Sequence, residues 1–548
     1  MDKDNGLVME TKDEAAPQVT DRGDRETVSV QEDSIKTIAQ TTTTIPGAKD
    51  LTLKEAIVAW PYAAMWSTIF MMPVILVAYS PAWIAVLYAM PAFARRFGFK
   101  FGDMYIIPAQ WQSALSACAM IGQIVGAPVS AVIMDKLGRR ITFLATLALT
   151  AGFVFIQFFA VSLGMTLAGG LLVGITMGSY GVLSLTYSIE IAPFRLRGVI
   201  GGMFSLSIVV GTLITALVSS RTVSIENEWS YKVGYALQWG WPAILMPLIY
   251  FAPESPVWLI RQGRRFDAER SLRTLAAVDF DVDPTLSLIE ETDRREREMD
   301  DATSYVELFQ GTNLRRTAVA VTCYVSMIAT GTVLINQLAY FMQLAGIEAE
   351  LAFNINLGSF GAAVIGSFVG MGLLAKFNRR KIYIAGQALS TLILVIIGIT
   401  QAAPHYFSRP SIVRGQAALF VIWNCLYGAI LSPFSTTIMG EISSTRLRSK
   451  TIAVANIAQF SGVIIATVVN PYLINPDEAA LQGYIGFIAG ASNLVFLVLI
   501  YFYVPETSRP SDELDALFEH NISARHFATY DLSRLTAPES RISITVAD

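Results

Sequence analysis

The sequence has few of the residues that form disulfide bonds, metal sites or nucleic-acid surfaces. It contains three cysteines and three histidines in 548 residues, and its formal net charge is −4. Cys118, Cys323 and Cys425 all lie in apolar stretches, which indicates neither a disulfide framework nor a metal site. The slight excess of acid gives no basic surface for nucleic acid. We also find no nucleophile–base arrangement and no nucleotide-binding loop. The sequence therefore predicts no cofactor, no metal, no nucleic-acid partner and no enzyme.

Charged residues are also scarce, at 15% of the chain against roughly 25% in ordinary soluble domains. Hydrophobic residues make up 53%, and they fall in long blocks, each close to the roughly 20 residues that a membrane-spanning helix needs. The sequence therefore predicts an all-α membrane protein with twelve transmembrane helices embedded in a lipid bilayer. The predicted spans are residues 60–90, 111–134, 142–162, 166–188, 199–219, 235–251, 317–341, 352–374, 382–402, 415–438, 452–472 and 484–504.

Polar stretches divide the chain into five parts. Residues 1–55 and 505–548 are polar tails, and the first has too few apolar residues to fold alone. Residues 56–252 and 317–504 each hold six predicted spans, and residues 253–316 form a polar central loop in which we expect short surface helices. Lys and Arg are more frequent in the loops after spans 2, 4, 8 and 10 than in the opposite loops. This bias places those loops and both termini in the cytoplasm.

The two six-span parts repeat the same loop signatures at a nearly constant offset. The repeated pairs are residues 135–140 with 375–380, residues 190–197 with 441–448, and Pro253-Glu254-Ser255 with Pro505-Glu506-Thr507. Such a repeat implies two pseudo-symmetric six-helix halves related by an axis along the membrane normal. This is the arrangement of major facilitator transporters, in which the substrate site lies between the halves.

The repeated acids and bases predict a cytoplasmic gate. Glu190 and Glu441 end their spans beside arginine-rich loops of the same half, where carboxylate–guanidinium pairs would hold the cytoplasmic side shut. The alternative is that the bases only orient the chain in the membrane, but orientation needs no paired acid. The predicted gate residues are Asp135, Arg139, Arg140, Glu190, Arg197, Glu254, Arg380, Glu441, Arg448 and Glu506.

These motifs resemble the signature set of the sugar porter family of the major facilitator superfamily. Finer features are similar to its fungal maltose and α-glucoside permease branch, and the resemblance runs from about residue 55 to residue 530. It implies a plasma-membrane transporter that moves a small neutral solute, a sugar or α-glucoside, by alternating access. Because each chain holds both halves of the cavity, we expect a monomer. The finer features include residues 88–93, Trp111-Gln112-Ser113, residues 122–126, residues 236–239 and residues 447–451.

The sequence departs from that branch where protons would be carried. The branch usually has Glu-Gly-Tyr-Asp in span 1, whereas this chain has Val77-Ala78-Tyr79-Ser80. None of the predicted spans has Asp, Glu, Lys, Arg or His in its middle, and such residues mark proton relays when they are present. The sequence therefore favours facilitated transport, or a coupling unlike that of the family.

The sugar-binding positions that the resemblance implies are also altered. The glutamines expected in span 7 are missing near Met327, and Gly211-Thr212 replaces an expected Gly-Gln. Each lost hydrogen bond to a buried sugar hydroxyl costs about 1–3 kcal/mol, so a pocket without these groups should bind sugars poorly. Since spans 1, 4, 7 and 10 line the cavity in this family, we predict substrate contacts there. For each of them the alternative is a hydrogen bond between helices of the bundle. The predicted contacts are Tyr79, Ser80, Asn336, Gln337, Trp423 and Asn424.

Two other functions remain open at the level of the sequence. A sugar-porter fold with a less polar pocket could import or export a neutral specialised metabolite instead of a sugar. A nutrient sensor would also lack coupling residues, but sensors in this family usually have a longer cytoplasmic tail than residues 505–548.

Overall fold

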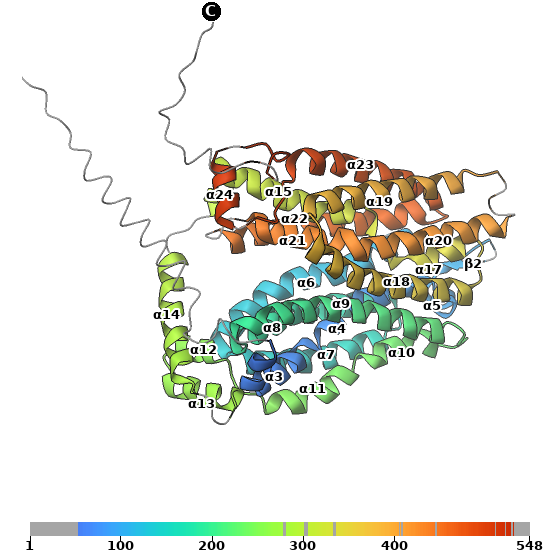
Figure 1. Cartoon of the computed structure of the whole chain (residues 1–548). Helices are drawn as coiled ribbons and strands as arrows, with labels where there is room; N and C mark the ends of the chain where they lie inside the picture. The colour runs from blue at the N-terminus through green and yellow to red at the C-terminus, as the bar shows by residue number, and fades with distance from the viewer. Residues whose placement is uncertain are drawn as a thin grey trace, which may run out of the picture.

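The computed structural model describes residues 53–530, except for residues 103, 278–280, 301–304, 333–335, 405, 407, 408, 444–446, 510, 521, 528 and 529. The disorder predicted for residues 1–55 therefore falls almost entirely outside the described residues. Figure 1 shows long helices that run side by side in two groups, the first half of the chain in blue and green and the second half in yellow to red.

The first half is almost entirely helical, with one short hairpin in which β1 pairs antiparallel with β2. Its elements are α2 (Leu53–Ala59), α3 (Pro61–Met71), α4 (Val74–Leu87), α5 (Pro91–Phe97), β1 (Phe99–Phe101), β2 (Met104–Ile106), α6 (Ala109–Leu137), α7 (Arg139–Phe158), α8 (Leu163–Ile191), α9 (Phe194–Thr222), α10 (Trp229–Leu237) and α11 (Gly240–Tyr250).

The central loop forms short helices, and the second half is again a bundle. The loop contains α12 (Pro256–Arg261), α13 (Arg265–Leu275), α14 (Asp283–Asp300) and η1 (Tyr305–Phe309). The second half contains α15 (Gly311–Ala329), α17 (Leu338–Leu344), α18 (Ala349–Lys376), α19 (Arg379–Gln401), α20 (Pro410–Leu426), η3 (Tyr427–Leu431), α21 (Ser432–Ile442), α22 (Arg448–Ile474), η4 (Gln482–Tyr484) and α23 (Ile485–Tyr503). The C-terminal tail adds α24 (Ser511–Glu519).

Ten helical segments of the described chain are long and apolar enough to cross a membrane by themselves. The other two predicted spans, 235–251 and 317–341, are broken. Span 6 consists of α10 and α11, interrupted at residues 238–239, so it begins at Trp229 rather than near residue 235. Span 7 begins with α15, which ends at Ala329, and continues with α17 from Leu338; we call the turn at Thr330 and Gly331 after α15 the break of span 7, and residues 333–335 are not described. With these two broken spans, the bundle has the twelve spans that the sequence predicts.

Glycines allow two helices of the first half to approach each other closely. A Cβ atom added to Gly122 or Gly126 of α6 would lie 2.3 Å from the carbonyl oxygen of Leu171 or 1.9 Å from that of Ile175 on α8. Association between helices in lipid depends on van der Waals packing, which small residues allow to be close. The backbones of α6 and α8 are therefore in direct contact.

The second half repeats this contact. A Cβ atom on Gly366 or Gly370 of α18 would lie 2.3 Å from the carbonyl oxygens of Cys425 and Ala429, respectively. Gly361, which has the same kind of spacing in the sequence, faces open space instead. The two halves thus share the packing of their second spans on their fourth spans, as pseudo-symmetry requires.

Candidate functional site

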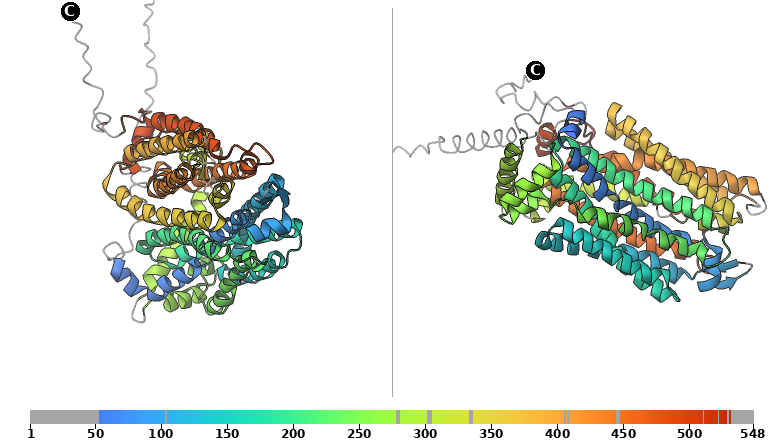
Figure 2. Two further views of the ribbon diagram at one scale, coloured as in Figure 1. Left: turned by 90° about the vertical axis from the view of Figure 1, so that its right-hand side faces the viewer. Right: turned by 90° about the horizontal axis from the view of Figure 1, so that it is seen from below.

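The arginine-rich motifs of both halves lie at one end of the bundle, which we call the motif end. The helices α12, α14 and α24 lie at this end, on the left of Figure 1. The opposite end, which carries β2, is called the far end. Figure 2 (left) views the bundle from the far end, with the yellow-to-red half above the blue-to-green half. The halves meet where α6 packs on α22 and where α9 packs on α18.

A buried ion pair joins α7 to α8 at the motif end. The Nε atom of Arg139 donates to Glu190 Oε2 at 2.9 Å, and its Nη2 atom donates to Oε1 at 2.8 Å. The Arg139 side chain is 1% exposed and that of Glu190 is 11% exposed. Asp135 lies 3.2 Å from the same guanidinium group. Paired, coplanar hydrogen bonds of this kind fix the relative position of two helices as well as attracting them.

A second carboxylate covers the beginning of α7. Glu254 accepts hydrogen bonds from the backbone N–H groups of Arg139 at 2.9 Å, Arg140 at 3.2 Å and Ser255 at 3.0 Å. Burial raises the pKa of the Glu254 carboxyl, while these N–H groups and the charge of Arg139 lower it. The first N–H groups of a helix have no partner within the helix, so a carboxylate at this place satisfies them. Glu254 thereby attaches the central loop to α7.

The second half repeats both interactions. Arg379 pairs with Glu441 at 2.9 Å, and Glu506 accepts from the backbone N–H groups of Arg379 at 3.0 Å and Arg380 at 3.2 Å. The Arg380 guanidinium lies 5.9 Å from the centre of the Tyr501 ring. Arg140 is placed in the same way, 5.4 Å from the Tyr250 ring of the first half.

One partner in this network was not among the predicted gate residues. Arg379, not Arg380, pairs with Glu441. Aligning residues 135–140 with 375–380 puts Arg379 opposite Arg139, so the repeat contained the signal that could have identified it. Arg197 is exposed on α9, and the Arg448 side chain lies outside the described residues. The described pairs join helices of the same half, and their function as a gate stays a prediction.

Three of the predicted substrate contacts form hydrogen bonds within their own half. The Tyr79 hydroxyl donates to the Gly234 carbonyl at 2.9 Å, and the Trp423 indole donates to Ser390 at 2.9 Å. The Asn424 amide donates to the carbonyl and hydroxyl oxygens of Ser359 at 3.1 and 3.0 Å. These are the contacts between helices that the sequence left open as the alternative.

The other three predicted contacts differ in their surroundings. Gln337 accepts a hydrogen bond from Asn470 at 3.2 Å, Ser80 is buried, and Asn336 is half-buried. Asn336 and Gln337 lie between α15 and α17 in span 7, and span 10 contains the π-helical turn η3. Helix breaks and π-helical turns occur often at functional sites. The structure does not bring the six residues together in one group, and their function as contacts stays a prediction.

The described spans carry their charges only near their ends. Every Asp, Glu, Lys or Arg of these helices lies close to one end, for example Glu190 in α8 and Arg414 in α20. The two positions at which the resemblance implies acids are occupied by half-buried Val77 and buried Ser80. Within the described residues, the middle of the bundle therefore holds no carboxyl or imidazole group that could carry a proton.

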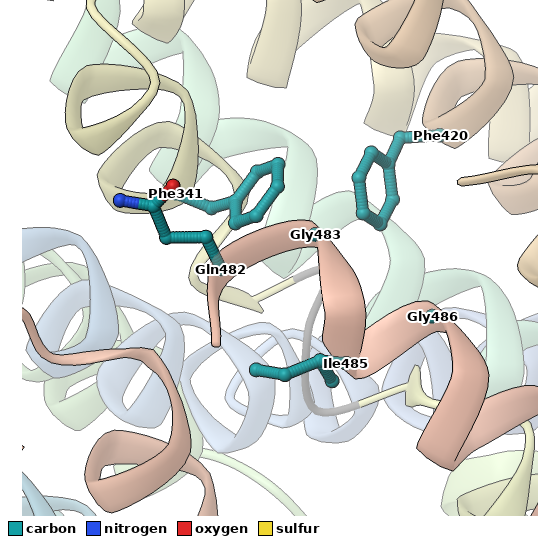
Figure 3. Close-up of a pocket in the computed structure, with 6 residues that line it drawn as sticks. All are labelled: Phe341, Phe420, Gln482, Gly483, Ile485 and Gly486. Carbon is teal, nitrogen blue, oxygen red and sulfur yellow. The ribbon is translucent and has the colours of Figure 1, made fainter. Parts of the chain in front are cut away.

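A small cavity in the second half lies away from the interface of the halves. It is lined by Phe341 of α17, Phe420 of α20, and the turn from Gln482 to Gly486. Figure 3 shows the two phenyl rings beside the turn that carries Gly483, and they pack edge to face. Their ring centres are 5.3 Å apart. Because its walls come from one half and are mostly apolar, this cavity is not the substrate site expected between the halves.

Twelve spans in two similar halves, each with the same acid–arginine motif, define a multi-pass membrane protein of the major facilitator fold. Residues 66–518 match the sequence model of the family described as "Sugar (and other) transporter", and the chain belongs to this family. A general alpha-glucoside permease of Saccharomyces cerevisiae is 31% identical over 491 residues, covering 88% of this chain and 79% of that protein. The maltose permease MAL31 of the same organism is 31% identical over 504 residues, covering 90% and 81%.

Solved structures confirm the fold. The partially occluded, inward-open structure of the xylose transporter XylE from E. coli matches with a TM-score of 0.64 and 17% identity, covering 82% of this chain and 99% of that chain. The relatives are permeases, so the predictions of a sugar transporter rather than an enzyme, and of the maltose and α-glucoside branch, are confirmed.

Proposed function

We propose that this protein moves an α-glucoside across the plasma membrane by alternating access of a site between its halves. The observation that carries the proposal is the identity of 31% with a general alpha-glucoside permease over 88% of the chain. The repeated motifs and the shared packing of α6 on α8 and of α18 on α20 support two halves that move as similar rigid bodies. A cargo other than a sugar is not favoured, because the named relatives are α-glucoside and maltose permeases.

The motif end faces the cytoplasm, because Lys and Arg gather in its loops. Both termini then lie on the cytoplasmic side. One chain suffices for transport, since it supplies both halves of the central site. The ion pairs Arg139–Glu190 and Arg379–Glu441 hold the cytoplasmic ends of the helices in each half in the arrangement that closes the gate.

Transport is facilitated rather than driven by protons. A proton-coupled site needs a group that changes its charge within the membrane during the cycle. The described spans offer no carboxyl or imidazole group in their middle, and Tyr79 is tied to the Gly234 carbonyl. The concentration gradient of the sugar therefore supplies the driving force.

We expect uptake of radiolabelled maltose in a host that lacks its own permeases, up to but not beyond the outside concentration. Neither the rate nor the final level should change when a protonophore collapses the proton gradient. The control is the same host with an empty vector. Accumulation above the outside level that the protonophore abolishes would contradict facilitated transport. If the protein reaches the cell surface but moves neither maltose nor other α-glucosides, the substrate class is wrong.

The substrate site is tested best between α15 and α17 in span 7. Asn336→Leu should raise the KM for the sugar about 5- to 100-fold with little change in the amount of folded protein, because a lost bond to a buried hydroxyl costs about 1–3 kcal/mol. Asn493→Leu is the matched control, since this buried residue of α23 is not a predicted contact and its amide bonds to Thr391 and to the Gln387 carbonyl of its own half. It should lower thermal stability and leave KM nearly unchanged. An unchanged KM in Asn336→Leu would remove this residue from the site.

A further inference from the structure

A buried hydrogen-bond network joins the two halves at the far end. The Gln112 side-chain amide of α6 donates to the Asn475 side-chain oxygen and to the Ile107 carbonyl, both at 2.8 Å. The Asn475 amide donates to the same Ile107 carbonyl at 2.9 Å. The Tyr340 hydroxyl of α17 donates to the Asn475 oxygen at 2.5 Å. We call Gln112, Tyr340 and Asn475 the far-end lock.

The lock is both buried and held rigidly on each side. Gln112 and Asn475 are 0% exposed and Tyr340 is 3% exposed. On the first half, the Tyr88 hydroxyl donates to the Gln112 carbonyl at 2.9 Å and fixes the beginning of α6. On the second half, the Asn475 carbonyl accepts from the Ala480 N–H group at 3.1 Å, in the turn after α22. Gln112 and Asn475 can bond to each other, and Asn475 to the Ile107 carbonyl, only when the two halves meet at this end.

Other hydrogen bonds at the far end also join the first half to the second half. The Gln343 amide of α17 donates to the Ala89 carbonyl at 2.8 Å, and the Ser113 hydroxyl donates to the Val468 carbonyl at 2.7 Å. The helix α17 is separated from α15 by the break of span 7, so it can move without carrying the rest of that span. The Gln343 bond therefore ties the first half to this short helix.

We propose that the far-end lock holds the outer side of the protein closed, and that Gln112 and Asn475 are positioning residues that set how often the site faces outward. The proposal rests on the alternating-access function proposed above. Loading a sugar from outside requires the halves to part at the far end, which breaks the bonds that cross between them, from Gln112 to Asn475 and from Asn475 to the Ile107 carbonyl. The bonds from Gln112 to Ile107 and from Tyr340 to Asn475 each lie within one half. All its groups are neutral, so the lock keeps its strength over the pH range in which a carboxylate or imidazole lock would weaken.

The test measures, in the absence of substrate, how readily a reagent from outside the cell reaches a residue that lies behind the lock. Thr467 of α22 is buried and contacts Met120 of the other half at 3.7 Å, just inside the lock. In a background that carries Cys118→Ala, Cys323→Ala and Cys425→Ser, so that no native thiol remains, Thr467→Cys is labelled on intact cells with a membrane-impermeant maleimide. Labelling should be slow with the lock intact and about 10-fold faster with Gln112→Leu or Asn475→Leu, since two or more buried hydrogen bonds are lost. Tyr340→Phe removes the hydroxyl that accepts a long bond from Gln112 across the halves at 3.5 Å and donates to Asn475 within the second half. It should give a smaller rise, and it serves if the leucine variants fail to fold.

A matched glutamine provides the control. Gln416 of α20 is also 0% exposed and bonds to the Ile397 carbonyl at 3.0 Å and to the Tyr406 hydroxyl, but both partners belong to its own half. Gln416→Leu should leave the labelling rate unchanged. Equal rises in Gln112→Leu and Gln416→Leu would show general loosening and overturn the lock, as would no rise in any lock variant.

Measurements of uptake and efflux distinguish a lock, which controls how often the site opens outward, from a contact that only stabilises the fold. Gln112→Leu should lower the KM for uptake from outside and slow efflux, whereas a fold defect would lower both rates alike. Faster labelling without any α-glucoside transport would keep the lock and refute the proposed substrate. Transport with unchanged labelling would keep the function and refute the lock.

Discussion

Gly126→Ala should remove most of the folded protein from the membrane. The added methyl group would lie 1.9 Å from the Ile175 carbonyl oxygen. Neither atom can turn away, because the backbone of α6 fixes the Cβ and the oxygen belongs to the backbone of α8. Relief requires α6 and α8 to separate, which also removes the contact at Gly122. We expect a loss of roughly 3 kcal/mol or more, at the upper end of what overpacking costs. Thermal stability in detergent and the amount at the cell surface measure it.

Gly181 is the matched control, because it lies on α8 and faces open space. Gly181→Ala should be neutral or slightly stabilising, since alanine favours a helix over glycine by about 1 kcal/mol. The second half offers the same comparison on α18, with Gly370 in contact with the Ala429 carbonyl and Gly372 in open space. If alanine at Gly126 and at Gly181 is tolerated equally, α6 and α8 are not in backbone contact.

Arg139→Met should be the most damaging substitution at the motif end. It leaves the Glu190 carboxylate without its two charged donors and frees the Met134 carbonyl, which Arg139 also bonds at 3.1 Å. Removing one partner of a buried pair costs about 3–5 kcal/mol. Thermal unfolding of the purified protein, together with the initial rate of sugar uptake, measures the loss. Arg139→Lys should recover only part of it, because an ammonium group cannot donate in the paired geometry.

The exposed pair of Arg265 with Glu290 gives the contrast. Its side chains are 67% and 38% exposed, although their separation of 2.9 Å is similar. Arg265→Met should cost less than about 1 kcal/mol and leave uptake unchanged, because exposed pairs contribute little. Equal losses in the Arg139 and Arg265 variants would mean that burial does not decide the strength of these pairs.

The sequence predicted the spans well where a helix is continuous and poorly where it is broken. Hydropathy measures only the apolar length of a segment, so it located α8 and α23 but not the interruption at residues 238–239. Hydropathy likewise predicted span 7 as one helix, although α15 ends at Ala329 and α17 begins only at Leu338. It also placed the beginning of span 7 after Arg315 and Arg316, whereas α15 already begins at Gly311. A break depends on what neighbouring helices offer the freed backbone groups, which a single sequence does not contain.

The motif end was predicted more successfully than the centre. At the motif end, the repeat shows each charged residue twice, and a buried charge has few possible partners. The involvement of Glu190, Glu254 and their counterparts Glu441 and Glu506 could therefore be predicted from the sequence pattern. In the centre, a polar side chain such as Trp423 can bind a solute or a neighbouring helix equally well. Its indole bonds to Ser390 because the packing of α20 on α19 brings that hydroxyl within 2.9 Å.

The sequence by itself determined the membrane location, the two similar halves and the position of the paired charges, because hydrophobic length and repetition are properties of the chain. Only the tertiary structure decided which glycines bring backbones together and that Gln112 and Asn475 meet across the halves. These depend on distances between residues far apart in the chain, such as the 2.8 Å from Gln112 to Asn475. Packing fixes such distances, and neither residue carries a charge or a motif that would reveal its partner.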